Sequence, residues 1–470
     1  MILKLSSILS SLMLAATSLY AAPSLTLHPE NPRYFRLGDK PAVLITSAEH
    51  YGVLLNLDFD YVKYLETLAA DGMNLTRIFS GAYMEPEGAF NITKNTLAPG
   101  PGRFICPWAR SNQPGYANGG NKFDLDQWDP AWFERLKAIV QKAGELGIVV
   151  EFTFFCPMYE DPQWKLSPMN ISNNINGVGD TGKHAVYNLD LRHGLQAVQE
   201  KLVRKVIAEL QGTGLLIYEI CNEPYFGGVT DAWQRRIADV IMDAQKDFPE
   251  KNLISWNVAN GSQKIVDPHP GISVFNFHYA NPPDAVALNF DLNKVIGDNE
   301  TGFKGTADEH YRMEAWEFIL AGGALFNHLD YSFAAGHEDG SFAYPPSQPG
   351  GGNAGFRQQM KRLKNFIHGF DFIKMKPSLE LLQAKLPEKA RCRILAAPGS
   401  QYAVYLKAGQ GTELPLQIGA GKYAVGWLDV ISGRQEILPP MDHQGGTASF
   451  KMPQGMNEAA LSIRRRETAD

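Results

Sequence analysis

A glutamate follows an apolar, strand-like run near the middle of the sequence. Residues 215–221 read Leu-Leu-Ile-Tyr-Glu-Ile-Cys, and Asn222, Glu223 and Pro224 come directly after them. No structural need places a carboxylate at the end of a buried strand, whereas a carboxylate there could transfer a proton in catalysis. Glu219 lies on the same alternating face as Glu223. Glu219 therefore either faces the same interior as Glu223 or lies in a deeper layer, as a structural acid paired with a cation.

A second glutamate ends a later run of the same kind. Residues 295–299 are Val-Ile-Gly-Asp-Asn, and Glu300 follows them. Asp308 and Glu309 compete for the same role, but they begin a helical pattern. Acidic residues in the first turn of a helix are favoured by the helix dipole and need no other explanation. Glu300 is therefore the predicted partner of Glu223.

Two carboxylates at the ends of two parallel strands could cleave a glycosidic bond. One of them, protonated, gives its proton to the departing oxygen, and the other attacks the sugar carbon. Where the two groups lie about 5–5.5 Å apart, the attack forms a covalent glycosyl intermediate and the configuration is retained. We assign the proton transfer to Glu223 and the attack to Glu300. Glu300 must then stay ionised, which requires hydrogen bonds or a nearby cation.

The elements that must position these residues repeat along the chain. Eight buried-type strands alternate with helical patterns, which predicts a parallel sheet. Eight repeats in about 330 residues fit a closed (β/α)₈ TIM barrel. An open doubly wound sheet is the alternative, but no glycine-rich phosphate turn follows the first strand. The predicted strands are 42–46, 73–79, 148–155, 215–221, 253–257, 272–278, 295–299 and 324–329, and the predicted helices are 58–71, 130–146, 195–211, 230–247, 309–322 and 353–369.

Three long segments follow predicted strands, at 80–127, 157–191 and 332–352. In a barrel, the loops after the strands open on one face, where the active site lies. These segments carry many aromatic residues, Trp108 among them. We therefore predict a wide, aromatic-lined cleft in which Trp108 contacts the substrate.

Past Pro377 the pattern changes to short alternating runs separated by Gly, Pro and Asp. Such runs predict a small all-β sandwich. We expect a barrel domain over residues 23–376 and a β-sandwich domain over residues 377–470. Trp427 could stack on a sugar, but its alternation with Tyr423 and Val425 favours a place in the core.

The first 22 residues have the pattern of a secretory signal peptide. Lys4 supplies the positive start, residues 5–20 are mostly apolar or small, and Ala21-Ala22 offers a cleavage site. A buried N-terminal helix is the alternative. We predict export to the periplasm or the exterior. No later apolar stretch reaches about 18 residues, so we expect no membrane span.

Charge and cysteine content narrow the function further. The net charge is −6 and like charges do not cluster, which disfavours a nucleic-acid binder or an acidic-membrane binder. The four cysteines, Cys106, Cys156, Cys221 and Cys392, form no CxxC motif and are too few for a disulfide framework. Cys106 and Cys156 each precede a proline, so one bridge between them and buried free thiols both remain open.

These features together resemble clan A of the glycoside hydrolases, most nearly the cellulase-like family 5, over about residues 40–370. In that clan, Asn-Glu-Pro after the fourth strand carries the acid/base, and a glutamate after the seventh strand is the nucleophile. The resemblance implies that Asn222 binds the sugar 2-hydroxyl, that Glu223 is the acid/base and that Glu300 is the nucleophile. The C-terminal region resembles the accessory β domains often attached to such barrels.

The resemblance extends to the second and sixth strands. Arg77 matches the arginine that supports the nucleophile, and its apolar neighbours favour a buried partner over a place on the surface. His278 and Tyr279 resemble a histidine–tyrosine pair in which the tyrosine contacts the nucleophile. Neighbours on an ideal strand point to opposite faces, and a buried core histidine is the alternative for His278. The tryptophan usual after the eighth strand has no counterpart in residues 326–333.

The residues after the first strand complete the predicted substrate site. Glu49 or His50 could donate or accept hydrogen bonds with a sugar, and Tyr51 could stack on it. Neither an HxH nor an HExxH motif accompanies them, so we predict no metal and no cofactor.

The sequence thus predicts an exported hydrolase, a glycosidase that cleaves β-glycosidic bonds of a poly- or oligosaccharide, with no obligate protein partner. A noncatalytic glycan-binding protein on the same scaffold and a metal-dependent barrel hydrolase are the alternatives. The first would have no reason to keep Glu223, Glu300, Asn222 and Arg77 together. The second would be expected to carry paired histidines, which the sequence lacks.

Overall fold

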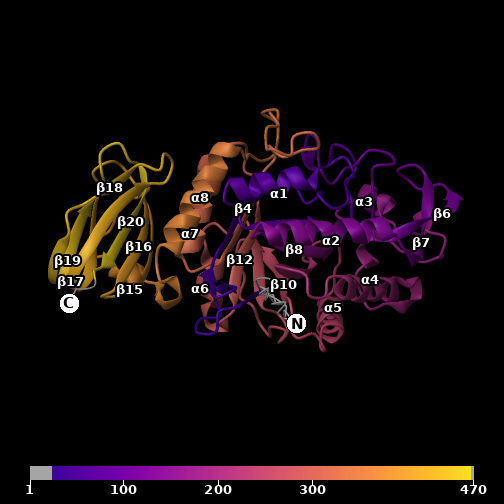
Figure 1. The fold of residues 1–470 in the computed structure, drawn as a ribbon, viewed down its shortest axis with the longest axis horizontal. Helices are drawn as coiled ribbons and strands as arrows, with labels where there is room; N and C mark the ends of the chain where they lie inside the picture. The colour runs from indigo at the N-terminus through magenta and orange to yellow at the C-terminus, as the bar shows by residue number, and fades with distance from the viewer. Residues whose placement is uncertain (1–23, 467–470) are drawn as a thin grey trace, which may run out of the picture.

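The computed structural model describes residues 24–466, which form a barrel surrounded by helices and a separate β-rich region beside it (Figure 1). The predicted signal peptide, residues 1–22, lies outside the described residues. A small antiparallel sheet of β1 (Leu25–Leu27), β2 (Phe35–Leu37) and β3 (Lys40–Ala42) precedes the barrel.

The barrel consists of eight parallel strands that follow one another around the sheet in sequence order. All eight fall where the sequence predicts them, and the barrel prediction is confirmed. Helices cover the outside of the strands, so both faces are buried, which explains the nearly unbroken apolar runs. The strands are β4 (Leu44–Ala48), β5 (Leu75–Phe79), β8 (Val149–Phe155), β9 (Leu216–Cys221), β10 (Leu253–Asn260), β11 (Val274–His278), β12 (Val295–Thr301) and β13 (Leu325–Leu329).

A side chain closes the seam between the first and second barrel strands. The Asn74 amide donates to the carbonyl of Val43 at 3.0 Å and accepts from the N–H of Ile45 at 2.8 Å. These bonds take the place of the main-chain ladder that joins the other neighbouring strands. The sheet is therefore closed, and the chain does not form the open doubly wound sheet that was the alternative.

Six long helices lie close to their predicted positions around the barrel (Figure 1). Four begin after an Asp, Thr or Asn whose side chain accepts hydrogen bonds from the first turn. Such caps satisfy N–H groups that would otherwise have no partner. Residues 261–273, between β10 and β11, form no helix. The helices are α1 (Tyr61–Ala70), α2 (Pro130–Glu145), α4 (Leu195–Glu209), α5 (Asp231–Ala244), α7 (Asp308–Leu320) and α8 (Ala354–His368), with short α3 (Asp161–Leu166) and α6 (Asp284–Asn289) between them.

The C-terminal region is one antiparallel sheet folded over a second apolar core. Its longest strand, β17, pairs with β19 along its first part and with β20 along its second part, so the sheet doubles back. Trp427 is 1% exposed within this core, as its alternation indicates. The strands are β14 (Lys376–Pro377), β15 (Arg391–Ala397), β16 (Gln401–Lys407), β17 (Glu413–Asp429), β18 (Gln435–Ile437), β19 (Met441–Lys451) and β20 (Glu458–Arg465).

Helices α7 and α8 lie between the barrel and the C-terminal sheet (Figure 1). The ring of Trp316 stacks on that of Tyr405 with centroids 5.7 Å apart. Arg312 forms a buried ion pair with Glu458 at 2.8 Å. Apolar packing and several charged pairs, the most deeply buried of them Arg312–Glu458, therefore join the two parts.

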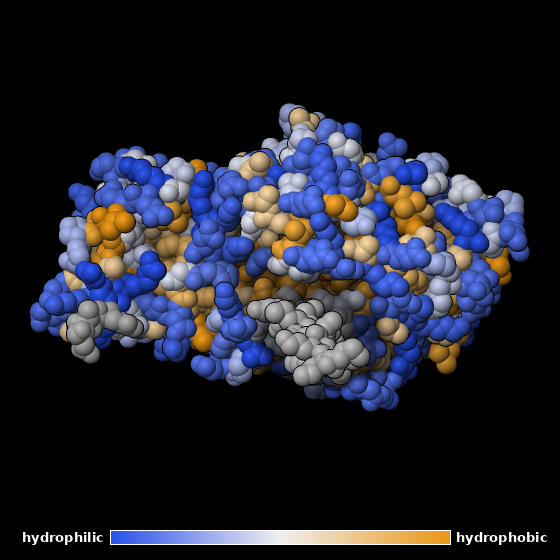
Figure 2. Space-filling model, viewed as in Figure 1, coloured by the Kyte–Doolittle hydropathy of each residue, from blue (hydrophilic) through white to orange (hydrophobic). Residues whose placement is uncertain are grey.

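The surface seen in Figure 2 is mostly hydrophilic, with small scattered apolar areas. Among the described residues, no helix combines the length and the apolar character needed to cross a membrane.

Candidate active site

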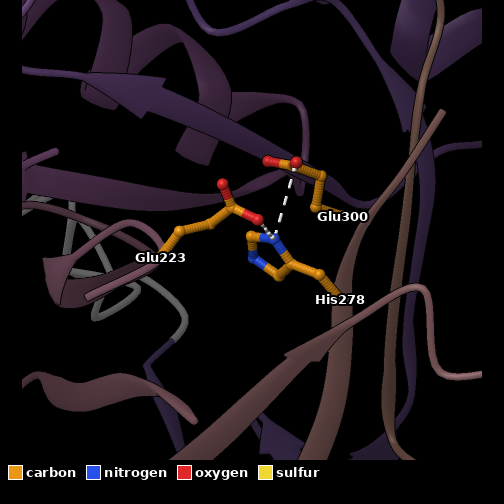
Figure 3. A group of neighbouring side chains, drawn as sticks. All are labelled: Glu223, His278 and Glu300. Carbon is orange, nitrogen blue, oxygen red and sulfur yellow. Dashed lines mark hydrogen bonds and ion pairs between the residues drawn. The ribbon is translucent and has the colours of Figure 1, made fainter. Parts of the chain in front are cut away.

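Glu223, His278 and Glu300 meet at the ends of three barrel strands, of which β11 and β12 are adjacent and β10 separates β11 from β9. Glu223 follows β9, His278 ends β11, and Glu300 lies near the end of β12. The three side chains point toward one another (Figure 3), and one donor or acceptor atom of each lies within 4.8 Å of the others. All three are buried. The geometry therefore brings together the two glutamates that the sequence predicts.

A register shift places Glu300 beside His278. Phe277 pairs with Asp298, but the next residue, His278, pairs with Glu300, so Asn299 is an extra residue in β12. Such bulges re-aim side chains and are common next to active sites. Asn299 bonds to Glu219 below the site at 2.8 Å. The bulge thus lets two consecutive side chains both point inward.

Three residues beside the site hold a left-handed backbone, and one of them is Tyr51 with φ +62°. Glu223 has φ +36° and Tyr279 has φ +52°, a region that costs free energy for residues other than glycine. The N–H of Glu223 donates to Asn257 Oδ1 at 3.0 Å, and the N–H of Tyr279 donates to the carbonyl of Glu300 at 2.9 Å. The turn at Tyr279 explains why its side chain faces the same site as that of His278, which an ideal strand would forbid.

Glu300 accepts hydrogen bonds from three sides. Tyr279 donates at 2.7 Å, Tyr51 at 2.9 Å and Arg77 at 3.2 Å, and His278 Nδ1 lies 3.5 Å away. Burial by itself would raise the pKa of Glu300, but the charge of His278, the bond from it and the charge of Arg77 outweigh burial. The pKa of Glu300 is therefore well below its usual range, and the carboxylate is ionised at neutral pH.

Glu223 has a different set of partners. It accepts from Tyr159 at 2.6 Å, from Tyr225 at 3.2 Å and from His278 Nδ1 at 3.2 Å. His278 thus bridges the two glutamates. Burial opposes the charge of His278, but Glu300 and Glu223 together raise its pKa to about 9. The histidine is a cation at neutral pH and is not a neutral core residue.

Arg77 is completely buried beneath the site and contacts three acceptors. It donates to Glu219 at 2.8 Å, to Glu300 at 3.2 Å and to Asn222 Oδ1 at 2.6 Å. Glu219 also accepts from Asn257 at 2.5 Å. Glu219 is therefore the deeper acid paired with a cation, and Arg77 is not a surface residue.

A cavity of about 310 Å³ opens above the two glutamates. A volume in this range suits a small ligand. Its lining is rich in aromatic rings, of which Phe90 and Tyr159 belong to the long segments predicted to line the cleft. The lining residues are His50, Tyr51, Phe79, Glu85, Phe90, Leu97, Cys156, Tyr159, Asn222, Glu223, Phe226, Asn260, Tyr279, Glu300 and Phe303.

Two predicted substrate residues lie elsewhere. The carboxylate of Glu49 accepts from the N–H groups of Gly52 at 3.0 Å and Val53 at 3.1 Å, so it holds the turn after β4 and does not line the cavity. The ring of Trp108 is 0% exposed, and it begins the hairpin of β6 (Trp108–Pro114) and β7 (Asn121–Trp128). This hairpin, which the sequence did not predict, buries Trp108 in the core.

The structure also shows where the alternative acids, Asp308 and Glu309, and the four cysteines lie. Asp308 accepts from Asn353 at 3.0 Å at the start of α7, and Glu309 pairs with Lys407, so neither lines the cavity. The cysteines at 106, 156, 221 and 392 are all buried free thiols, so Cys106 and Cys156 do not form a bridge.

Sequence reasoning missed Tyr159, Tyr225 and Glu85 as site residues. Tyr159 is one of the aromatic residues in a segment predicted to line the cleft, and Tyr225 follows Pro224. Closeness to the Asn-Glu-Pro motif was the signal available for Tyr225. Glu85 lies in a long segment without periodicity, and no sequence signal distinguishes it there.

Within the described residues, Glu223, His278 and Glu300 form the group whose donor atoms could surround a metal ion. A metal binds the neutral imidazole. The raised pKa of His278 means that a metal would have to displace a proton held by two carboxylates. Metal binding at this group would therefore compete with protonation of His278.

Comparison with known proteins identifies the fold. No protein-family model matches the chain, and no curated protein matches its sequence. A solved structure described as a glycoside hydrolase aligns with a TM-score of 0.65 at 14% identity, over 94% of this chain and 97% of that one. A putative glycoside hydrolase from Bacteroides vulgatus aligns with the same score and identity over 95% of this chain and 83% of its own.

A third structure, a glycoside hydrolase family 5 protein from Bacteroides vulgatus, also aligns with a TM-score of 0.65 and 14% identity. The alignment covers 94% of this chain and 93% of that one. The likeness therefore includes both the barrel and the C-terminal sheet. The chain has the fold of these glycoside hydrolases, a (β/α)₈ barrel followed by an all-β domain.

Proposed function

We propose that this protein is a retaining glycoside hydrolase that cleaves β-glycosidic bonds of an oligo- or polysaccharide. The observation that carries the proposal is the pair of buried glutamates, Glu223 and Glu300, whose oxygens lie within 4.8 Å and which share one histidine. This spacing favours direct attack by a carboxylate over attack by an intervening water, which would require about 6.5–9.5 Å. The shared fold with glycoside hydrolases supports the same conclusion.

The two glutamates have unequal surroundings, and we assign their roles from that difference. Glu300 is held ionised by His278 and Arg77, as a nucleophile must be. Glu223 contacts two tyrosine hydroxyls and faces the same cavity, where it is placed to give a proton to the departing oxygen. Asn222, whose Oδ1 is fixed by Arg77, would bind the sugar 2-hydroxyl.

The reaction then proceeds in two displacements. The Glu300 carboxylate forms a bond to the anomeric carbon while the bond from that carbon to the leaving oxygen breaks, and the proton of Glu223 moves to that oxygen. Water next attacks the anomeric carbon, gives its proton to Glu223 and releases Glu300. Each proton taken from Glu223 is returned, so the enzyme ends unchanged.

The substrate and the location are also proposed. The aromatic lining of the cavity supports a carbohydrate, because sugar rings pack their apolar faces against such side chains. The β configuration rests on the resemblance to clan A, and export rests on the signal-like residues 1–22.

The test is a pair of site variants assayed on aryl β-glycosides. Glu300→Gln should abolish turnover while leaving the fold and sugar binding intact. Glu223→Ala should slow turnover by about 10²–10⁴-fold on poor leaving groups. It should spare substrates with good leaving groups, and azide should restore its rate by forming a glycosyl azide. Glu309→Gln, which removes an acid outside the cavity, is the matched control.

The competing functions give different results. If both variants cleave at the wild-type rate, the assignment of roles is wrong. If the wild type binds glycans and cleaves none of the panel, the protein is a noncatalytic binder. A loss of activity in a chelator, restored by a divalent cation, would instead support metal-dependent hydrolysis.

A further inference from the structure

The cavity contains a third buried acid, Glu85, which the proposed reaction does not use. Glu85 lies in the segment after β5 and is 3% exposed. One oxygen accepts from the Tyr83 hydroxyl at 3.1 Å, and the other accepts from Asn95 and lies 3.4 Å from His50 Nε2. Glu85 and His50 both line the cavity. Such an ordered carboxylate–imidazole pair is a polar group that a ligand would meet.

The Glu85–His50 pair lies on the nucleophile side of the site. His50 is next to Tyr51 in sequence, their rings stack at 5.4 Å, and Tyr51 donates to Glu300. The partners of Glu223 instead include Tyr225, which follows β9. In a retaining enzyme the acid/base lies beside the leaving group, and the nucleophile lies beneath the sugar that is cleaved. Groups beyond Glu300 therefore face the glycone.

The segments that follow β4 and β5 touch each other beside this pair. The Thr96 hydroxyl donates to the carbonyl of His50 at 2.7 Å, and a Cβ on Gly52 would lie only 2.1 Å from the Thr96 carbonyl oxygen. Glycine is thus needed at position 52 for the two segments to touch. Leu97 of the same segment lines the cavity. A glycan could not continue past this contact without moving main chain.

The segment that contains Thr96 is also bonded to a third segment of the chain. The N–H of Thr93 donates to Gln348 at 3.0 Å, and the side chain of Asn91 donates to the carbonyl of Ser347 at 2.9 Å. These bonds connect the segment after β5 to the segment after β13. Three segments are therefore joined to one another beside Glu85, and we infer that they block a glycan on this side of the cavity.

We propose that Glu85 and His50 bind the hydroxyl groups of a terminal sugar, and that the protein removes residues from the non-reducing end of its substrate. This inference rests on the proposed function and specifies it. A carboxylate accepts hydrogen bonds from neighbouring sugar hydroxyls, and the charge-assisted bond is stronger than a neutral one.

The first experiment follows the products of the wild-type enzyme. The 4-nitrophenyl β-glucoside, mannoside, galactoside and xyloside identify the sugar, and oligosaccharides of that sugar, labelled at the reducing end, show where the chain is cut. We expect each labelled chain to shorten from the unlabelled end only. Labelled fragments from mid-chain cuts would overturn this inference and leave the proposed function standing. No hydrolysis of any substrate would overturn both.

The second experiment tests Glu85 directly. Glu85→Gln should lower kcat/KM on the aryl glycoside by about 10- to 100-fold, as expected for loss of charged hydrogen bonds. Glu87→Gln, the same change at an exposed position two residues on, should leave kcat/KM unchanged. Monodeoxy glycosides separate binding from structure. The effect of Glu85→Gln should disappear on the substrate that lacks the contacted hydroxyl.

If Glu85 has only a structural role, the Glu85→Gln variant should give a different result on the deoxy substrates. If Glu85→Gln lowers kcat/KM by the same factor on every deoxy substrate, or does not lower it at all, Glu85 does not bind the sugar. Should the variant fail to fold, the labelled-chain experiment on the wild type still decides whether the enzyme acts from the chain end.

Discussion

Two buried arginines of this molecule bind carboxylates in different ways. Arg312, between the barrel and the C-terminal sheet, donates twice to one acid, Glu458, at 2.9 and 2.8 Å. Arg77, under the cavity, divides its donors between two acids, Glu219 and Glu300. At Arg312 one cation meets one anion, whereas at Arg77 one cation serves two anions.

The difference distinguishes a contact that joins two parts of the protein, here called the joint, from the candidate active site. A buried pair of balanced charge satisfies itself and fixes how two parts of a protein meet. A buried excess of negative charge is costly, and functional sites are where such excess is commonly found. Here the excess is compensated by a second cation, His278, which contacts both glutamates at the cavity. Charge imbalance next to a cavity thus points to the site more directly than the number of ion pairs does.

The largest effect is expected from removing each arginine. Arg77→Met leaves Glu219 and Glu300 buried with a single remaining cation, and Arg312→Met leaves Glu458 buried without the cation that it pairs with. Each should lower the free energy of unfolding by about 3–5 kcal/mol. Only Arg77→Met should also lower kcat/KM of the folded protein, because only Arg77 touches the nucleophile and Asn222. Urea unfolding and steady-state kinetics in the folded range measure the two effects.

The control for this comparison is a double replacement. Arg312→Met combined with Glu458→Leu removes both charges and should recover most of the lost stability, since balanced pairs are often replaceable by apolar residues. Equal losses of kcat/KM in Arg77→Met and Arg312→Met would contradict the distinction between joint and site.

The charged residues at the site and the Arg312–Glu458 pair should also contribute differently to the pH dependence of stability. His278 has a pKa raised to about 9, above the roughly 6.5 of an unfolded histidine, so its contribution is complete below pH 6.5 and is lost as pH rises through 9. The depressed pKa of Glu300 acts in the opposite direction, with its contribution complete above about pH 4.3 and lost only in stronger acid.

Raising the pH from 6.5 to 9.5 should therefore lower the free energy of unfolding by about 3 kcal/mol through His278. The Arg312 pair should not contribute, because an arginine stays charged throughout this range. Urea titrations at a series of pH values measure the slope, and His278→Gln should flatten it. A slope that survives in His278→Gln would assign the effect to other groups.

The strands and the two glutamates could be predicted because strong local patterns mark them. Burial on both faces forces apolar runs such as residues 149–155, and a carboxylate directly after such a run stands out. Arg77 stood out for the same reason, as a charge within an apolar run. The sequence could not show that a bulge at Asn299 and a left-handed turn at Tyr279 would aim neighbouring side chains at one site.

The long segments were the least predictable part. They have no periodicity, so nothing in the sequence distinguishes Glu85, which lines the cavity, from Glu49, which binds the N–H groups of its own turn. The prediction for Trp108 is wrong because an aromatic residue in a segment without a helix pattern can face either the cleft or the core. The β6–β7 hairpin buries that ring instead. Contacts between segments far apart in sequence decide these positions.

The smallest effect compares two tyrosines that each donate to a buried glutamate. Tyr279 donates to Glu300 at 2.7 Å, and Tyr405 donates to Glu458 at 2.9 Å. Tyr279→Phe and Tyr405→Phe each remove one charge-assisted bond, worth about 1.5 kcal/mol. We expect Tyr279→Phe to lower kcat/KM about tenfold, because that bond helps hold the nucleophile, and Tyr405→Phe to shift only the urea midpoint. Equal kinetic losses in the two variants would mean that the site and the joint are coupled. A loss confined to Tyr279→Phe would show that the contacts around Arg77 act on the reacting carboxylate. The contacts around Arg312 would then affect only stability, although both groups hold a glutamate by similar hydrogen bonds.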